Sequence, residues 1–353
     1  MKKKQLAGLL MALALAVSLF AGCAGQTTDT PAPPAAEAPE SEAAPDPERK
    51  LTFGYSLNDM SHEWYQNIAL GARAQAEELG IDIMISDAAM DVATQVSQLE
   101  SYIVQGVDVL IVTPVDVKAL EPIMVQAREA GIPVITESNV VPGAVTYVGI
   151  DNLAGGIKAG EWFVEYAKAN NVDPVILIVG LPAFEDCRLR VEGFKKAMDD
   201  AGLDYRIAQE VDGQGATEIA LRVSQDALTA NPDVNVIFGI NDNSTTGAMA
   251  AFREAGLDEG ILTAIGFGFE GAVGREALLS GGPYKAALAM FPDYMGVQVV
   301  NAAFKAYNGE SLPDNFESGT IVITRDNFAD FYSEVNNEWS TNFAAITALL
   351  AAG

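Results

Sequence analysis

The sequence predicts an α/β protein built from two doubly wound lobes, each with a parallel sheet. Three observations lead to this prediction. From Leu51 onward, short apolar runs alternate with amphipathic stretches, this alternation occurs twice along the chain, and most of the apolar runs are continuous. Continuous apolar strands separated by helices are typical of parallel βαβ units, whose helices cover both faces of the sheet.

In the first half we expect five strands with three helices between them. Apolar residues three and four positions apart mark a helix, as where Val92, Val96, Leu99 and Ile103 share one face. The expected strands are 51–56, 81–86, 107–112, 133–136 and 146–150, and the expected helices are 62–79, 91–105 and 117–130.

The second half repeats this alternation. The expected strands are 174–180, 205–211, 234–240, 261–266 and 284–290, and the expected helices are 185–202, 215–230, 243–256, 271–280 and 293–308. In the tail after Arg325, Phe328, Phe331, Tyr332 and Val335 recur at helical spacing. We therefore expect a helical tail that packs on the second lobe.

The first 22 residues have the pattern of an export signal. Lysines at 2–4 precede an apolar run over 6–20 that ends in small residues. The run is shorter than the roughly 20 residues of a membrane-spanning helix. The segment 19–23, Leu-Phe-Ala-Gly-Cys, resembles the bacterial lipoprotein box, which implies cleavage after residue 22 and a lipid on Cys23. Plain secretion and a permanent membrane helix are the alternatives.

Residues 23–50 are expected to form a tether between that lipid and the lobes. The stretch 24–48 holds six Pro, seven Ala and six acidic residues, and no aliphatic side chain larger than Ala. Such a composition buries too little apolar surface to offset the chain entropy lost on folding. We expect a disordered linker that holds the lobes outside the cell surface.

Composition excludes several classes of function. The chain has 21 Lys plus Arg against 48 Asp plus Glu, a net charge of -27, so it should not bind nucleic acid or attach to anionic lipid through surface charge. Two cysteines and one histidine cannot build a disulfide framework or a Cys- and His-rich metal site. We expect no metal, no cofactor and no catalytic residue. A Gly-x-Gly-x-x-Gly pattern at 266–271 is interpreted as a glycine-rich cleft wall.

Ligands of open parallel sheets bind at the carboxyl ends of the strands, so the loops there are the candidate site. These loops carry carboxamides, carboxylates, an arginine and adjacent aromatics. This chemistry suits a polyhydroxylated ligand, because each hydroxyl both donates and accepts a hydrogen bond. The loops are 58–65, 113–116, 137–139, 149–152 with Gly155 and Gly156 behind it, Glu185, Asp186 and Arg188, then 241–243 and 267–270.

Over about 51–324 the chain resembles the periplasmic sugar-binding proteins of the ribose-binding type, the solute receptors of ABC importers. The motifs that carry the resemblance are Trp64-Tyr65, Thr113-Pro114-Val115-Asp116, Ile132-Pro133-Val134-Ile135, Asp151-Asn152 with Gly155-Gly156, Arg188 before Gly193-Phe194, and Asn241-Asp242 before Gly247-Ala248. The resemblance implies two lobes, 51–150 plus 291–319 and 151–290 plus 320–353. It also implies three crossings, near Ile150, Met290 and Gly319, about which the lobes close on ligand.

The same resemblance implies which residues contact the ligand: His62, Trp64, Tyr65, Asn152, Arg188, Asn241 and Phe267. The chain departs from the pentose-binding members at three places. Ser138-Asn139 stands where they carry Asp-Arg, Phe267-Gly268 with Glu270 beyond it where they carry Phe-Asp, and Met290 where they often carry Gln. Ser138, Asn139, Glu270 and Met290 therefore join the candidate site, and a less hydroxylated or more apolar ligand than ribose is plausible.

Several of these residues also have an alternative interpretation in which their role is structural only. Trp64 or Tyr65 can pack in the core, His62 can be a loop residue, Arg188 can form a surface ion pair, and Asn152 and Asn241 can cap helices.

Three functional classes also remain. The first is a monomeric, extracytoplasmic lipoprotein that delivers a sugar-like ligand to an ABC permease, and that ligand can also be a nucleoside, a polyol or an autoinducer. The second is a receptor that signals to a chemotaxis protein or a kinase. The third, an exported hydrolase, is disfavoured because no nucleophile or metal motif occurs.

Overall fold

The computed structural model describes residues 49–335 and 338–352. The expected signal peptide at 1–22, the lipidated Cys23 and nearly all of the tether lie outside the described residues. The predicted fold class is confirmed, since the chain forms two six-stranded sheets covered by helices and a small two-stranded sheet near its end. None of the helices in the described ranges is long and apolar enough to cross a membrane.

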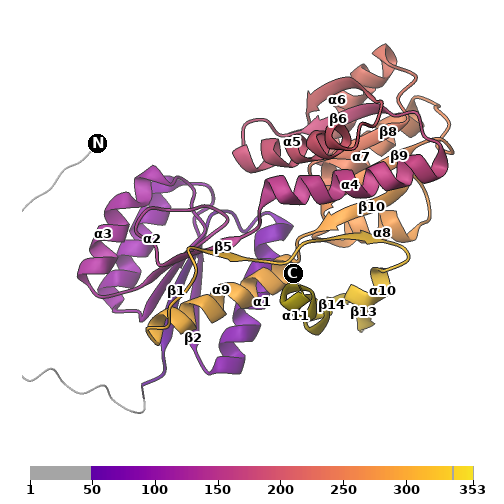
Figure 1. Ribbon diagram of the computed structural model, residues 1–353. Coiled ribbons are helices and arrows are strands. Elements are labelled where there is room, and N and C mark those ends of the chain that lie inside the picture. Colours follow the sequence, from indigo (N-terminus) through magenta and orange to yellow (C-terminus); the bar gives the residue numbers. More distant parts are fainter. Residues whose placement is uncertain (1–48, 336–337, 353) are drawn as a thin grey trace, which may run out of the picture. The chain divides into compact units, whose positions relative to one another are not determined.

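The first sheet has the strand order β11-β5-β4-β3-β1-β2 and is parallel throughout. Its strands are β1 (Thr52–Leu57), β2 (Asp82–Asp87), β3 (Val109–Val112), β4 (Val134–Glu137), β5 (Thr146–Gly149) and β11 (Asn315–Glu317). One face packs on α1 (Glu63–Leu79) and α9 (Pro292–Tyr307), and the other on α2 (Val92–Gln105) and α3 (Glu121–Glu129), which follows a 3-10 turn (Figure 1).

The second sheet has the order β12-β10-β9-β8-β6-β7, in which only the pairing of β12 with β10 is antiparallel. Its strands are β6 (Val175–Gly180), β7 (Arg206–Asp212), β8 (Val236–Gly239), β9 (Thr263–Gly268), β10 (Tyr284–Ala289) and β12 (Ile321–Thr324). Helices α4 (Asn152–Asn170) and α5 (Glu185–Asp200) cover one face, and α6 (Thr217–Ala230), α7 (Asp242–Glu254) and α8 (Ala272–Leu279) lie on the other side (Figure 1).

The chain passes between the two sheets three times. It leaves the first sheet after β5 and enters α4, returns from β10 to α9, and leaves again between β11 and β12. Because β11 pairs with β5 and β12 pairs with β10, each sheet receives a strand from a distant part of the sequence. The carboxyl ends of the strands in both sheets lead into the loops that the sequence singles out.

Apolar periodicity does not predict helix α4, which the structure contains. Its buried face includes Gly155, Gly156, Ala159 and Gly160, which carry almost no hydrophobic signal. Small residues are required on this face, because a β-carbon on Gly156 would collide with the carbonyl oxygen of Arg190 in α5. The two helices therefore pack with their backbones in near contact.

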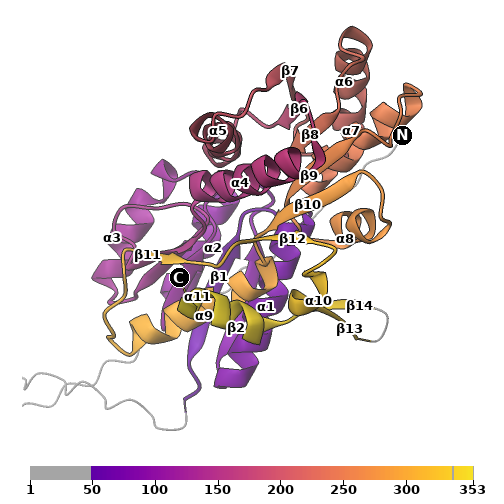
Figure 2. The ribbon, with the colours of Figure 1, turned by 45° about the vertical axis from the view of Figure 1, so that its right-hand side comes forward.

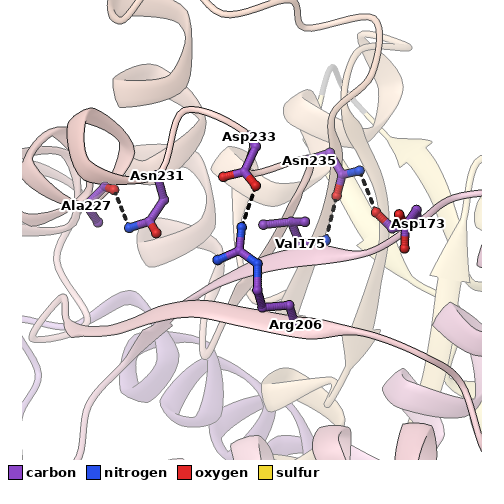
Figure 3. Close-up of polar contacts among 7 residues, drawn as sticks. All are labelled: Asp173, Val175, Arg206, Ala227, Asn231, Asp233 and Asn235. Atoms are coloured by element: carbon purple, nitrogen blue, oxygen red, sulfur yellow. Dashed lines mark hydrogen bonds and ion pairs between the residues drawn. The ribbon is translucent and has the colours of Figure 1, made fainter.

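Polar contacts secure the amino end of the second sheet, away from the strand ends that lead into the candidate site (Figure 3). The Asn235 side chain accepts from the backbone N–H of Val175 at 2.9 Å and donates to the carbonyl oxygen of Asp173 at 2.9 Å. Arg206 forms an ion pair with Asp233 beside them. These bonds tie the starts of β6, β7 and β8 together.

The expectation of a fully helical tail is wrong. Short α10 (Phe328–Phe331) leads into a hairpin of β13 (Tyr332–Val335) and β14 (Glu338–Thr341), and α11 (Phe343–Ala352) follows. Aromatic packing explains the departure from helical periodicity. The Phe328 ring meets the Trp339 ring edge-on at 4.8 Å and stacks on Tyr332 at 5.1 Å, so the hairpin folds back over the short helix.

The tail packs on residues from both sides of a crossing, and its last helix, α11, lies beside α9 (Figure 2). Phe328 and Tyr332 contact Phe269, which follows β9, while Phe331 and Tyr332 contact Phe291 at the start of α9. Farther along, the Tyr294 hydroxyl of α9 and the Thr347 hydroxyl of α11 lie 2.9 Å apart.

Candidate ligand-binding site

Arg190 organises the part of the site contributed by the second sheet. Its Nε donates to Asn152 Oδ1 at 2.8 Å, and its Nη1 donates to the Ile240 carbonyl oxygen at 2.9 Å. The guanidinium carbon lies 4.6 Å from the centre of the Phe267 ring, a cation–π distance. Arg190 thus joins the start of α4, the end of β8 and the end of β9.

Glu270 and Met290 lie beside this group. The Glu270 backbone N–H donates to Asp242 Oδ2 at 3.2 Å, and the Met290 N–H donates to the Gly268 carbonyl oxygen at 3.0 Å. Gly268 leaves room for both side chains, because a β-carbon there would lie 3.1 Å from Glu270 Oε2 and 3.9 Å from Met290 Cε. Glu270 is 7% exposed and Met290 is 2% exposed, so both residues are almost fully buried beside Gly268.

A second group lies at the strand ends of the first sheet. Asn58 Nδ2 donates to the Tyr65 hydroxyl oxygen at 3.0 Å, and Asn58 Oδ1 is buried without a partner in the described part of the chain. Glu137, the last residue of β4, is fully buried and accepts from Thr113 Oγ1 at 2.7 Å and from the neighbouring Ser138 hydroxyl. Ser138 has a φ of 64°, a left-handed conformation that is uncommon outside glycine and occurs often at functional sites.

The two groups influence each other electrostatically. The pKa of Glu137 is raised to about 7, mainly by burial and to a smaller extent by the Asp186 carboxylate of α5, while its two hydroxyl donors oppose the rise. Burial also raises the Glu270 pKa to about 7, with Arg190 opposing the rise and Glu63 of α1 adding to it. A direct bond crosses between the sheets, since Asn67 Nδ2 of α1 donates to the Glu270 carbonyl oxygen at 2.7 Å.

Asp242 extends the acidic part of the site. Burial and the nearby Glu270 carboxylate raise its pKa to about 7, although it accepts from the Tyr284 hydroxyl and from the Glu270 N–H. Such buried carboxyls are costly to ionise, which is a frequent property of ligand sites.

The structure brings most of the expected residues to these two groups. Asn152, Phe267, Glu270 and Met290 surround Arg190 or Gly268, while Tyr65 and Ser138 lie near Asn58 and Glu137. Asn139 follows directly, half-buried, with its N–H bonded to the Glu137 carbonyl oxygen at 2.8 Å.

Other expected residues have structural partners. His62 is the N-cap of α1, where its Nδ1 accepts from the Trp64 N–H at 3.1 Å, and burial lowers its pKa. Trp64 is 8% exposed and belongs to the apolar core. Asn241 caps α7 through the Ser244 N–H and donates to the Gly215 carbonyl oxygen.

Arg188, two residues before Arg190 on α5, lies outside the polar group that Arg190 organises. It is exposed, and its Nη1 donates to the Pro182 carbonyl oxygen at 2.7 Å. It lines a hollow of about 510 Å³ between α5 and β7 whose floor includes Val191 and Val211. The hollow lies at the edge of the second sheet, and Arg190 does not line it.

Sequence reasoning did not single out Arg190 as a site residue, although a signal was present. In α5 the buried residues Cys187 and Phe194 lie three before and four after position 190. That spacing places Arg190 on the inner face of the helix and Arg188 off it.

Comparisons with known proteins identify the family of this chain. A family model described as a periplasmic binding protein domain matches residues 53–311. The chain therefore belongs to the periplasmic binding protein family, a family of binding proteins rather than enzymes.

Two kinds of relative specify the resemblance further. The ribose import binding protein RbsB of Escherichia coli is 27% identical over 278 residues, which cover 78% of this chain and 91% of that protein. The crystal structure of an ABC transporter periplasmic solute binding protein from Actinobacillus succinogenes with bound D-allose has a TM-score of 0.72 and 26% identity, and the match covers 80% of this chain and all of that one. A solute binding protein of Mycobacterium smegmatis with bound glycerol matches at a TM-score of 0.69 with 28% identity, over 80% and 97% of the two chains. The resemblance to ribose-binding-type proteins is confirmed.

Proposed function

We propose that this protein captures one sugar-like molecule between its two lobes outside the cytoplasm and delivers it to the permease of an ABC importer. The observation that carries the proposal is the Arg190 group, in which a half-buried guanidinium is fixed by Asn152, Ile240 and Phe267 next to the nearly buried carboxylate of Glu270. Prearranged donors, acceptors and an aromatic ring suit a hydroxylated ring compound.

Relatives support this choice of ligand class. The Escherichia coli relative is a ribose import protein, and the two similar solved structures hold D-allose and glycerol. We assign the lobes to 51–150 plus 291–319 and to 151–290 plus 320–353, which close about the crossings near Ile150, Met290 and Gly319. Binding is reversible and leaves the ligand unchanged, because closure and not chemistry carries the function.

The proposed ligand contacts combine the sequence-based set with the residues that the geometry adds. Tyr65, rather than the core residue Trp64, is the aromatic of its pair that meets the ligand. The set is His62, Tyr65, Ser138, Asn139, Asn152, Arg188, Arg190, Asn241, Phe267, Glu270 and Met290.

A thermal-shift panel tests this function. Aldoses, polyols, deoxy sugars and nucleosides are each added to the purified chain, and ligand binding to the native state raises the melting temperature by mass action. At least one sugar-like compound is expected to stabilise the protein by several degrees. The absence of stabilisation by every sugar-like compound would refute the proposal.

We also propose that lipid on Cys23 anchors the protein to the membrane, with residues 23–50 as the tether. Replacing Cys23 by Ser removes the thiol that would carry the lipid. Cys23→Ser is therefore expected to move the protein from the membrane fraction to the soluble extracytoplasmic fraction. Membrane association that survives the substitution would count against the anchor.

A further inference from the structure

Two residues of the candidate site are each next to a phenylalanine with a left-handed backbone. Phe269 directly precedes Glu270 and has a φ of 51°, and Phe291 directly follows Met290 and also has a φ of 51°. Residues other than glycine rarely adopt this conformation, because the β-carbon crowds the following carbonyl oxygen. Such a backbone persists only where the surrounding structure holds it.

The ring of Tyr332, in the tail, contacts both phenylalanines. Its centre lies 5.5 Å from that of Phe269, edge-on, and 5.9 Å from that of Phe291. All three side chains are buried, so their packing is enclosed on every side. One side chain of the tail therefore packs on the neighbours of both Glu270 and Met290.

Arg275 of α8 connects Tyr332 to Glu270 by a second route. Its guanidinium carbon lies 5.0 Å from the centre of the Tyr332 ring, a cation–π distance, and its Nη2 donates to the Glu270 carbonyl oxygen at 3.4 Å. The same carbonyl oxygen accepts from Asn67 Nδ2 of α1 at 2.7 Å. The Glu270 backbone is thus held between α1 and an arginine that lies against the tail.

The backbone also joins the segments that carry Glu270 and Met290. The Met290 N–H donates to the Gly268 carbonyl oxygen at 3.0 Å, and Gly268 itself has a φ of 94°. Both side chains lie close to Gly268, since a β-carbon there would be 3.1 Å from Glu270 Oε2 and 3.9 Å from Met290 Cε. A displacement of Phe269 or Phe291 would therefore change where both side chains lie.

We propose that Tyr332 is a positioning residue of the ligand site, which holds Glu270 and Met290 in place through Phe269 and Phe291. This inference rests on the proposed function, because it concerns the same site. It gives the tail a role in binding, although the tail lies beyond residue 311, where the match to the family model ends. The two positioned residues stand at places where this chain departs from the pentose-binding members.

The test compares Tyr332→Leu, which removes the ring, with Tyr332→Phe, which keeps it. Phe343→Ala is the control. Phe343 lies in the same tail, but its ring packs on Tyr294 of α9 at 5.4 Å, and within 49–335 and 338–352 it makes no ring contact with Phe269 or Phe291. Its loss should weaken the tail without moving the site.

The first readout requires no ligand. Labelling methionine methyl groups with ¹³C gives each methionine its own NMR signal, and Met290→Leu identifies the signal of Met290. The position of a methyl signal depends on the aromatic rings around it. We expect the Met290 signal to move in Tyr332→Leu and to keep its wild-type position in Tyr332→Phe and Phe343→Ala.

The second readout is affinity, measured by titration calorimetry below the melting temperatures of all variants. The probes are D-ribose, D-allose and any compound of the thermal-shift panel that stabilises the chain more than these two. We expect Tyr332→Leu to bind the tightest of these compounds about ten-fold more weakly than the wild-type chain. Tyr332→Phe and Phe343→Ala should bind it within about two-fold of the wild-type affinity.

An unmoved Met290 signal in Tyr332→Leu would overturn the inference, and so would an equal movement in Phe343→Ala. A moved signal with unchanged affinity would also overturn it, because binding would then not depend on the positioned residues. If no compound binds the wild-type chain, the proposed function fails, and the Met290 signal alone decides whether Tyr332 positions this segment. If Tyr332→Leu does not fold, Tyr332→Met, whose flexible side chain adapts to the space, takes its place with the same expected results.

Discussion

Arg190 Nε donates to Asn152 Oδ1 at 2.8 Å, a bond that joins the first residue of α4, directly after the first crossing, to a half-buried residue of α5. This bond fixes the guanidinium over Phe267. In the proposed site, a ligand would meet a preoriented arginine, which reduces the ordering cost of binding.

Replacing Arg190 by Gln should therefore impair binding strongly. The substitution leaves Asn152 Oδ1 and the Ile240 carbonyl oxygen without their donors and removes the charge above Phe267. We expect affinity to fall by at least about ten-fold and unfolding free energy to fall by about 1–3 kcal/mol. Calorimetry and urea denaturation measure the two effects, and unchanged affinity would exclude Arg190 from the site.

Arg188→Ala separates binding from stability. Arg188 is exposed and has one described bond, to Pro182, so its removal should cost less than about 0.5–1 kcal/mol of stability. Since the family resemblance assigns this position to the ligand, binding should nevertheless be lost. Retained affinity would place the ligand against Arg190 alone.

The buried carboxyls predict an unusual pH dependence of stability. A carboxyl whose pKa is about 7 in the folded state and about 4.5 when unfolded stabilises the fold fully below pH 4.5, and this contribution disappears as the pH rises through 7. For Glu137 the loss is on the order of 3 kcal/mol, at about 1.4 kcal/mol per pKa unit. Glu137→Gln should flatten the fall in unfolding free energy between pH 5 and 7. An identical slope in the variant would show that Glu137 titrates normally.

Close helix packing gives a prediction about Gly296. A β-carbon there would collide with the Ile68 carbonyl oxygen of α1, so Gly296→Ala must push α9 away. Overpacking of this kind costs about 1–3 kcal/mol or more. Gly282→Ala is the control, because its β-carbon would approach only Ser280 Oγ, at 3.5 Å. Equal melting temperatures for the two variants would contradict the α1–α9 contact.

The tail should contribute to stability through its aromatic cluster. Phe328 is 4% exposed and packs on Tyr332, Trp339 and Phe269, so Phe328→Ala should cost about 3–5 kcal/mol. Val335, 51% exposed in β13, is the control and should cost less than about 0.5 kcal/mol when replaced by Ala. Similar denaturation midpoints would mean that the tail does not pack as described.

The sequence predicts the architecture well because parallel strands are buried on both faces and read as continuous apolar runs. The expected strands of the two lobes end within two residues of the observed ones. Helix α4 escapes prediction because glycine and alanine form much of its buried face, and the hairpin escapes because ring packing between Phe328 and Trp339 overrides helical spacing.

The candidate site is predictable to a smaller degree. Strand-end loops point to Tyr65, Asn152, Phe267 and Glu270, which do lie in the two polar groups. The pairing of a particular arginine with Asn152 depends on which face of α5 meets the sheet, and the burial of Glu137 depends on how β4 packs between β3 and β5. Such long-range relationships become visible only in the folded chain.

The central claim is reversible capture of one sugar-like molecule without turnover. Titration calorimetry of the mature chain carrying Cys23→Ser, with the most stabilising compound of the thermal-shift panel, tests it most directly. We expect one site per chain, a dissociation constant in the micromolar range or below, and chemically unchanged compound recovered after unfolding. No measurable binding, or recovery of a converted product, would contradict it.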